Sequence, residues 1–445
     1  MNEKITARTS AVMILNRILE DDSYGNIELS RELTKLSLEL RDKGLVTEIV
    51  NGTLRNMTKI DFILAKFVEG KTVDLAVKNI LRAAIYQIYF LDKIPISAAV
   101  NEAVESAKVL ANSGAAKFVN GVLRNIERKY EEIIFPQKED GVSDFLALEY
   151  SYPKWLVDIW LDRFGIEFTE ELLEAGNERP MVSLRTNSMK TDRETLVEIL
   201  KEQEIEAETG EWSPLSIKIK GGASIDKLKG FSEGLFTVQD EASMMAVIAL
   251  DPKAGERVAD LCCAPGGKST FILEKTNCEA ELTAGDVHQH KLKLVEDGFK
   301  RLGLKNYTLK LWDILKFDDS MRNRFDKIIL DAPCSGFGVI RKKPDMKIRK
   351  KQSEIKELVE IQKKMLVNAA KYLKKGGLLI YSTCTMSLEE NEDMVKWAVE
   401  GNNNLKLESL KGKLPESMVD KDGMAKLYPN VHHTDGFFIA ALRKY

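Results

Sequence analysis

The chain contains little cysteine and little histidine. Five of its 445 residues are cysteine and four are histidine. The number of cysteines is odd and no Cys-x-x-Cys pair occurs, which argues against a disulfide framework and against a zinc site. The sequence therefore predicts a reducing compartment, the cytoplasm, and no metal site. The histidines are expected on the surface because no ligand pattern surrounds them; they are His288, His290, His432 and His433.

Long apolar runs and net positive charge are also missing. No apolar run reaches the roughly 20 residues that a membrane-spanning helix needs. The N-terminus, MNEKITAR, lacks the apolar core of a signal peptide. We therefore expect no membrane partner. The formal charge of −3 also excludes a molecule-wide basic surface of the kind that binds nucleic acid.

Positive charge is concentrated in one short run, residues 341–351, which reads RKKPDMKIRKK. A solvated surface is the ordinary explanation of such a run, and contact with phosphate groups is the alternative. The run closely follows the sequence Asp331-Ala-Pro-Cys-Ser335 at the end of a predicted strand. That position favours phosphate contact.

The length predicts two or three domains. Apolar residues recur at helical spacing through residues 1–135, which predicts an all-helical bundle. Residues 145–235 mix helical and strand patterns and are expected to form a small α+β segment. In residues 236–445, strands and helices alternate, which predicts an α/β domain with a mainly parallel sheet and helices on both faces. Its main expected strands cover residues 257–261, 282–286, 307–311, 327–331 and 377–382.

The most informative stretch of this domain is residues 257–270, RVADLCCAPGGKST. A short buried strand is followed by Gly266 and Gly267 and then by a helical pattern. A strand, a glycine turn and a helix present small ligands at the carboxyl edge of an α/β sheet, although a tight turn without a ligand is the alternative. Cys262 stands where a P-loop needs its first glycine, and the Gly-x-Gly-x-x-Gly pattern of dinucleotide sites is absent.

Acidic residues lie at or near the ends of four of the expected strands: Asp260, Asp286, Asp313 and Asp331. Asp286, about twenty residues beyond the glycines, is placed to accept the hydroxyl groups of a ribose. Asp313 is placed to reach an adenine amino group. Any one of these acids alone is better explained as a helix cap. Three of them in register with a glycine turn favour a nucleoside cofactor.

Two cysteines follow the last two of the five expected strands, residues 327–331 and 377–382. Cys334 lies in Asp331-Ala-Pro-Cys-Ser335 and Cys384 lies in Ser382-Thr-Cys-Thr385. Burial as a small apolar side chain is the alternative to chemistry, and we favour it for Cys262 and Cys263. A thiolate that adds to C6 of a pyrimidine makes C5 electron-rich enough to accept a methyl group. Asp331 could then stabilise or protonate N3.

These residues closely resemble the RNA cytosine-5 methyltransferases of the NOL1/NOP2/Sun family, whose cofactor is S-adenosylmethionine and whose catalytic domain is a Rossmann-like class I methyltransferase fold. The resemblance implies that Cys384 is the nucleophile, that Cys334 aids product release, and that Asp331 and Lys268 are catalytic. DNA cytosine-5 enzymes use the cysteine of a Pro-Cys pair, so Cys334 is the competing nucleophile. Cys263 stands where alanine is common. The implied cofactor-binding residues are Cys262, Cys263, Ala264, Pro265, Gly266, Gly267, Lys268, Asp286, Asp313 and Asp331.

The resemblance extends over nearly the whole chain. Residues 98–108 and 117–124 look like parts of an RNA-binding helical domain related to the antitermination factor NusB, here residues 1–135. With a catalytic domain at residues 236–445, this combination is similar to the bacterial RsmB (Sun/Fmu) group, which methylates cytosine 967 of 16S rRNA. The resemblance implies that the partner is a 16S rRNA stem-loop, free or in an early assembly intermediate. It also implies that the protein does not bind DNA and is a monomer. Transfer RNA as substrate, or a non-catalytic assembly or antitermination factor, remain the alternatives.

Overall fold

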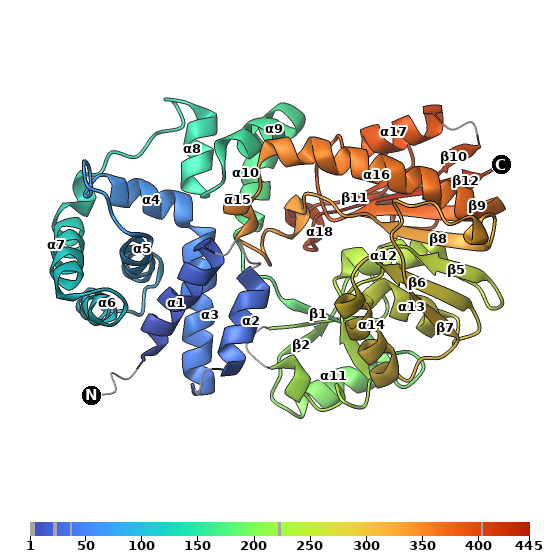
Figure 1. The fold of residues 1–445 in the computed structure, drawn as a ribbon, viewed down its shortest axis with the longest axis horizontal. Helices are drawn as coiled ribbons and strands as arrows, with labels where there is room; N and C mark the ends of the chain where they lie inside the picture. The colour runs from blue at the N-terminus through green and yellow to red at the C-terminus, as the bar shows by residue number, and fades with distance from the viewer. Residues whose placement is uncertain (1–4, 21–24, 36–37, 221–223, 402–403) are drawn as a thin grey trace. The chain divides into compact units, whose positions relative to one another are not determined.

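A computed structural model describes residues 5–20, 25–35, 38–220, 224–401 and 404–445. The chain forms two compact units, each of which is described by itself (Figure 1). The first, the helical unit, consists of residues 1–178 together with 340–350. The second, the sheet unit, consists of residues 179–339 and 351–445. No helix among the described residues is long and apolar enough to cross a membrane.

The helical unit contains only helices as regular elements within its described residues, as the apolar spacing predicts. Apolar side chains at helical spacing, such as Ile80, Leu81 and Ile85, are fully or almost fully buried in its core. The helices are α1 (Ala7–Glu20), α2 (Gly25–Lys35), α3 (Leu40–Arg55), α4 (Met57–Ala65), α5 (Leu75–Phe90), α6 (Ile96–Leu110), α7 (Ser113–Lys129), α8 (Val142–Glu149), α9 (Lys154–Phe164), α10 (Ile166–Ala175), the later α15 (Met346–Arg349), and a short 3-10 turn at Tyr130–Glu132. Helices α8 to α10 thus lie in this unit, although the sequence assigns most of them to the α+β segment.

The sheet unit begins with a small antiparallel sheet, the middle sheet, in the order β2-β3-β1-β4. Its strands are β1 (Val182–Thr186), β2 (Ala207–Thr209), β3 (Ser216–Ile219) and β4 (Phe236–Val238), and α11 (Arg193–Lys201) accompanies them. Leu184, Leu196 and Phe236 are fully buried in the core of this α+β segment.

A larger sheet follows, with strand order β10-β12-β9-β8-β5-β6-β7, and β11 pairs with β12. Strands β5 to β9 pair with one another in parallel fashion, whereas β12 pairs in antiparallel fashion with β9, β10 and β11. The bounds are β5 (Arg257–Asp260), β6 (Glu281–Asp286), β7 (Tyr307–Leu311), β8 (Phe325–Asp331), β9 (Leu373–Thr383), β10 (Leu405–Glu408), β11 (Ala425–Leu427) and β12 (Phe437–Lys444). The predicted α/β class is confirmed, and each of the five predicted parallel strands is observed.

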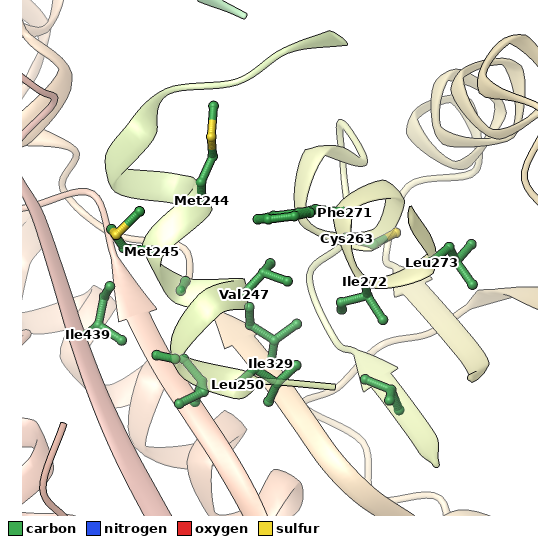
Figure 2. Packing of buried hydrophobic residues seen from close by; sticks show 14 of the residues in the cluster. Met244, Met245, Val247, Leu250, Cys263, Phe271, Ile272, Leu273, Ile329 and Ile439 are labelled. Atoms are coloured by element: carbon green, nitrogen blue, oxygen red, sulfur yellow. The ribbon is translucent and has the colours of Figure 1, made fainter. Parts of the chain in front are cut away.

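Helices cover both faces of this sheet because its strands are apolar on both sides. The helices are α12 (Glu241–Leu250), α13 (Gly267–Lys275), α14 (Gln289–Leu302), α16 (Gln352–Tyr372), α17 (Glu392–Gly401) and the short α18 (Pro429–His432). On one face, Ile329 and Ile439 pack with α12 and α13 (Figure 2). On the other, Leu330 and Phe438 pack with α16 and α17. Because β5, β6, β8 and β9 are parallel to one another, their carboxyl ends lie at the same edge of the sheet.

Candidate active site

The turn between β5 and α13 contains residues 262–268 and is called the glycine turn here. Backbone hydrogen bonds hold its start against both neighbouring strands, from Leu261 N to Ile329 O at 3.1 Å and from Cys263 N to Gly285 O at 2.9 Å. Gly266 has φ +108, and a Cβ at this position would lie 3.3 Å from Val295 Cγ1. The turn therefore needs glycine both for its backbone conformation and for its close approach to α14.

Asp286 and Asp313 lie where the sequence predicts, at the ends of β6 and β7. The carboxylate of each is oriented by its own loop, since Asp286 Oδ1 accepts from His288 N at 2.9 Å and Asp313 Oδ1 accepts from Leu315 N at 3.1 Å. Asp286 is 9% exposed. Both carboxylates are at the sheet edge that carries the glycine turn, as expected for groups that hold the two ends of a nucleoside.

A cavity of about 370 Å³ opens beside the glycine turn. Its lining includes the turn, Asp260 and Asp331, together with Thr237 of β4 and Gln239, which follows β4. Asp286 and Asp313 are not among its lining residues. The structure therefore brings the turn and Asp331 together in one cavity, and places the other two acids farther along the same edge.

The two predicted cysteines lie side by side. Strands β8 and β9 are neighbours, with Asp331 opposite Ser382 in the register, so the chain after each strand emerges at the same place. Cys334 Sγ and Cys384 Sγ are 3.4 Å apart. The hydrogen bond with Cys384, together with burial and the nearby carboxylates of Glu390 and Asp331, raises the pKa of Cys334 well above its usual value. Cys334 is therefore a neutral thiol, and either sulfur atom can be the hydrogen-bond donor of the pair.

Asp331 connects this cysteine pair to the glycine turn. Its Oδ2 accepts from Lys268 Nζ at 2.7 Å, and its Oδ1 accepts from Ser382 Oγ at 2.8 Å. Lys268 also lies 5.2 Å from the centre of the Phe437 ring. A carboxylate, an ammonium group and two thiols thus converge at one edge of the sheet, from elements far apart in the sequence.

Comparisons with known proteins agree with this arrangement. Residues 247–443 match the family described as 16S rRNA methyltransferase RsmB/F. Residues 5–128 match the NusB family, and residues 152–226 match a ferredoxin-like domain of RsmF/B-like methyltransferases. The probable ribosomal RNA small subunit methyltransferase B of Bacillus subtilis (strain 168) is 39% identical over 99% of both chains. The chain belongs to the RsmB/F family.

Other relatives of this RsmB/F member cover all or about two thirds of the chain. Ribosomal RNA small subunit methyltransferase B of Klebsiella pneumoniae (strain 342) is 32% identical over 100% of this chain and 99% of its own. A methyltransferase homologue from Pyrococcus horikoshii, of known structure, matches 68% of this chain and 99% of its own at 30% identity, with a TM-score of 0.60. NSun6 from the same organism, solved with the S-adenosylmethionine analogue SFG, matches 66% of this chain and 98% of its own at 26% identity and TM-score 0.60. The chain is thus an S-adenosylmethionine-dependent methyltransferase whose substrate is small-subunit rRNA.

The residues of the sheet edge suit this cofactor. Gly266 gives the close backbone approach that a ligand at the turn requires. Carboxylates suit a cofactor that carries a positively charged sulfur, and Asp260 and Asp331 line the cavity. Asp260 is buried beside Ser269, whose Oγ donates to Asp260 Oδ2 at 2.7 Å, and burial raises the pKa of Asp260 to about 6.

Cys262 and Cys263 contribute their backbone atoms to the glycine turn. Their thiols pack against the hydrophobic clusters instead. Cys263 is 4% exposed and packs in the hydrophobic cluster below the turn, and Cys262 packs against the cluster on the opposite face of the sheet. Burial, with a smaller effect from nearby acids, raises the pKa of both thiols. Neither thiol is a nucleophile at neutral pH in this environment.

A buried network that the sequence analysis missed joins the two cysteine loops. Glu390 is fully buried. Its Oε1 accepts from Ser335 N at 2.9 Å and from Gln362 Nε2 at 3.0 Å, and its Oε2 accepts from Ser335 Oγ. Ser335 Oγ also lies 2.6 Å from Thr385 Oγ1. The residues next to Cys334 and Cys384 are thereby tied together. No sequence signal marked Glu390, because acids are common just before a helix such as α17.

The same loops approach each other through glycine. Gly338 N donates to Cys384 O at 2.9 Å, and Gly436 N donates to Gly338 O at 2.8 Å. A Cβ at Gly338 would lie 1.9 Å from Gly436 O, so any other residue here would push the backbone away from Cys384. The run Asp435-Gly-Phe-Phe438 in the sequence was the available signal for this contact.

The prediction that residues 341–351 bind phosphate is wrong for Lys347. This side chain is 5% exposed within the helical unit. Its Nζ donates to Arg55 O at 3.1 Å, to Tyr150 O at 3.0 Å and to Asn177 Oδ1 at short range, and lies 3.7 Å from the centre of the Tyr152 ring. Burial lowers the pKa of Lys347. Its three N–H bonds serve the helical unit's own acceptors, and none remains for a phosphate.

The prediction of surface histidines is wrong for His432, which is 2% exposed. Its Nδ1 accepts from Tyr428 N at 3.0 Å and its ring lies 5.6 Å from that of Trp212. It is a structural residue at α18. Among the described residues, no group of three or more histidine, cysteine or acidic side chains is arranged to hold a metal ion.

Proposed function

We propose that this RsmB/F methyltransferase transfers a methyl group to C5 of a cytosine in 16S rRNA, cytosine 967, through a covalent adduct between Cys384 and C6 of the base. The observation that carries the proposal is the pair of thiols 3.4 Å apart beside Asp331. A single nucleophile would need one thiol. A second thiol in contact with it suits a reaction in which an adduct must first form and then be released.

Cys384 is the nucleophile in this proposal because Cys334 holds the proton. A neutral Cys334 thiol that donates to Cys384 stabilises the Cys384 thiolate, and the thiolate is the reactive form. Addition forms the Sγ–C6 bond and moves the C5–C6 electron pair toward C5 and N3. Asp331 holds the base, and the ammonium group of Lys268, whose Nζ lies 2.7 Å from Asp331 Oδ2, offsets the negative charge that develops on the base.

S-adenosylmethionine, when bound, supplies the electrophilic methyl group that C5 accepts. The glycine turn, Asp286 and Asp313 hold this cofactor in our proposal. Release then requires that C5 lose its proton and that Cys384 leave C6. Once Cys384 is bonded to carbon, the thiolate that raised the pKa of Cys334 is gone. Cys334 then gives up its own proton to water and, as a thiolate, takes the proton from C5, so that the C5–C6 double bond re-forms as the Cys384 thiolate departs.

The target base must leave its stack to reach the thiols, which costs a few kcal/mol unless it is already unpaired. Sequence-selective RNA recognition also favours loops. We therefore expect the substrate to be a 16S rRNA stem-loop, free or in an early assembly intermediate, and not DNA. We also expect the enzyme to be a monomer. Equal methylation of the stem-loop and of a fully paired duplex with the same sequence would contradict this expectation.

The test uses a Cys334→Ala variant mixed with S-adenosylmethionine and the 16S rRNA stem-loop, followed by a denaturing gel. We expect a protein–RNA adduct that survives denaturation, because the residue that releases it is missing. The adduct should vanish in the Cys334→Ala/Cys384→Ala variant and persist in Cys334→Ala/Cys278→Ala, which removes a cysteine distant in sequence from both loops. An adduct that forms with Cys384→Ala alone would exchange the two roles. No adduct in any variant would overturn the covalent mechanism.

A further inference from the structure

Arg185 is a charged side chain with no solvent exposure, in the middle of strand β1 of the middle sheet. Its Nη2 donates to Glu274 Oε1 at 2.7 Å and its Nε donates to Glu274 Oε2 at 3.1 Å. Glu274 is itself 1% exposed and lies on α13. Removing one member of a buried pair of this kind leaves an uncompensated charge in the interior, so the middle sheet and α13 are firmly joined at this point.

The guanidinium group also reaches the glycine turn. Its Nη1 donates to Gly267 O at 2.8 Å and its Nη2 donates to Thr270 Oγ1 at 2.9 Å. Thr270 Oγ1 donates in turn to Gly267 O at 3.0 Å. The arginine lies 4.7 Å from the centre of the Phe271 ring, which belongs to α13 and to the core cluster shown in Figure 2. A cation near the first turn of a helix is disfavoured by the helix dipole. Arg185 is held at this position by its hydrogen bonds to Gly267 O and Thr270 Oγ1.

A second strand of the middle sheet takes part in the same cluster. Gln239 follows β4, and its Oε1 accepts from Arg185 Nη1. Gln239 also faces Gly267, since a Cβ at Gly267 would lie 3.5 Å from Gln239 Cδ. Both Gln239 and Gly267 line the cavity of about 370 Å³. One guanidinium group therefore connects β1, the end of β4, α13 and the wall of the cavity.

We infer that Arg185 is a positioning residue for the glycine turn, and that the middle sheet thereby sets the affinity of the enzyme for S-adenosylmethionine. Arg185 acts through Gly267 and Thr270 and does not itself line the cavity. The inference rests on the use of S-adenosylmethionine by the RsmB/F family and not on the proposed adduct with Cys384. Absence of the Cys384 adduct in a protein that binds S-adenosylhomocysteine normally would count against the proposed chemistry alone.

The test compares two variants of the full-length protein. Arg185→Lys keeps a positive charge beside Glu274, but lysine lacks the fork that reaches Gly267 O and Thr270 at the same time. Arg185→Met/Glu274→Met removes both buried charges, which proteins often tolerate without loss of stability. S-adenosylhomocysteine is the probe, titrated by calorimetry. We expect its Kd to rise about tenfold or more in both variants, as befits the loss of a hydrogen bond from a charged donor.

Further readouts separate positioning from mere support of the fold. We expect faster hydrogen exchange in the peptide that contains residues 264–270, a raised KM for S-adenosylmethionine, and an unchanged KM for RNA. The matched control is Arg443→Met/Glu408→Met, which removes a bidentate pair between β12 and β10 that does not touch the turn. It should bind the probe as the wild type does.

A wild-type Kd for S-adenosylhomocysteine in either folded variant would overturn the inference. If the double variant does not fold, Arg185→Lys decides the question. If neither variant folds, Arg185 supports the sheet unit as a whole and the positioning role is rejected.

Discussion

Asp260, at the end of β5, should make the stability of the sheet unit depend on pH in an unusual direction. Its side chain is buried, and burial raises its pKa from 3.8 to about 6. The substitution Asp260→Asn keeps the shape of the side chain and an oxygen that can accept the hydrogen bond from Ser269 Oγ. It removes the ability to ionise and turns the other carboxylate oxygen into an NH2 group, a change whose effect does not vary with pH. The variant therefore isolates the free energy of burying this charge.

The sign follows from the two pKa values. The folded state binds the proton more tightly than the unfolded state, so this contribution to the free energy of unfolding is fully present below pH 3.8 and is lost as pH rises through about 6. The difference between the two pKa values corresponds to about 3 kcal/mol, at 1.36 kcal/mol per pKa unit. Relative to the wild type, Asp260→Asn should gain up to about 3 kcal/mol between pH 4 and pH 7.

The assay is urea unfolding of both proteins at pH 4.5 and pH 7, with hydrogen exchange used to identify the transition that exposes β5. Asp318→Asn serves as a control of opposite sign. A hydrogen bond from Lys310, with others from Ser320, lowers the pKa of Asp318 to about 2. Its stabilising contribution is present above pH 3.8 and lost as pH falls toward 2, so Asp318→Asn should be weakened by nearly the same amount at pH 4.5 and pH 7. If Asp260→Asn differs from the wild type equally at both pH values, burial does not hold this carboxyl neutral and the reasoning is wrong.

Two further predictions concern buried contacts. Glu390→Ala should lower kcat for methyl transfer about tenfold or more, about 1.4 kcal/mol, because Ser335 loses its tie to Gln362. The Kd of S-adenosylhomocysteine should stay within about twofold of wild type, since Glu390 does not touch the glycine turn. Glu389→Ala, at the exposed neighbouring residue, is the control. An equal loss of kcat in both variants would contradict the prediction. Lys347→Met should destabilise the helical unit by about 2–4 kcal/mol, because it removes the donor to Arg55 O and Tyr150 O, and should raise hydrogen exchange in α3. Lys108→Met, on an exposed pair with Glu105, should change stability by less than about 1 kcal/mol, and an equal effect of the two lysine variants would show that the buried contacts of Lys347 do not matter.

The sequence predicted that both cysteine loops lie at the carboxyl edge of the sheet, whereas the strand order that makes β8 and β9 neighbours comes from the structure. Each loop follows a strand with an apolar run near its carboxyl end, residues 328–330 in β8 and 378–381 in β9, and the carboxyl ends of parallel strands share an edge. Asp331 and Ser382 stand opposite each other in adjacent strands, so Cys334 and Cys384 were bound to emerge close together. Alternation of apolar residues also predicted the helical and α/β parts, since burial of such faces is the main driving force of folding.

Contacts between distant segments were decided by the tertiary structure. Nothing in the local sequence around Lys347 distinguishes it from the other basic residues of 341–351, and it is buried only because Arg55, Tyr150 and Asn177 offer three oxygen atoms in space. His432 is buried for the same kind of reason.

The sequence by itself determined the elements of this protein and the chemistry at their ends, because backbone periodicity, glycine turns and strand-end residues are local properties. The tertiary structure decided which side chains support that chemistry. Arg185 and Gly267 are 82 positions apart, and Ser335 and Glu390 are 55 apart. A charge or a carboxyl group is stable in the interior only when its partners surround it, and those partners come together only when the whole chain has folded.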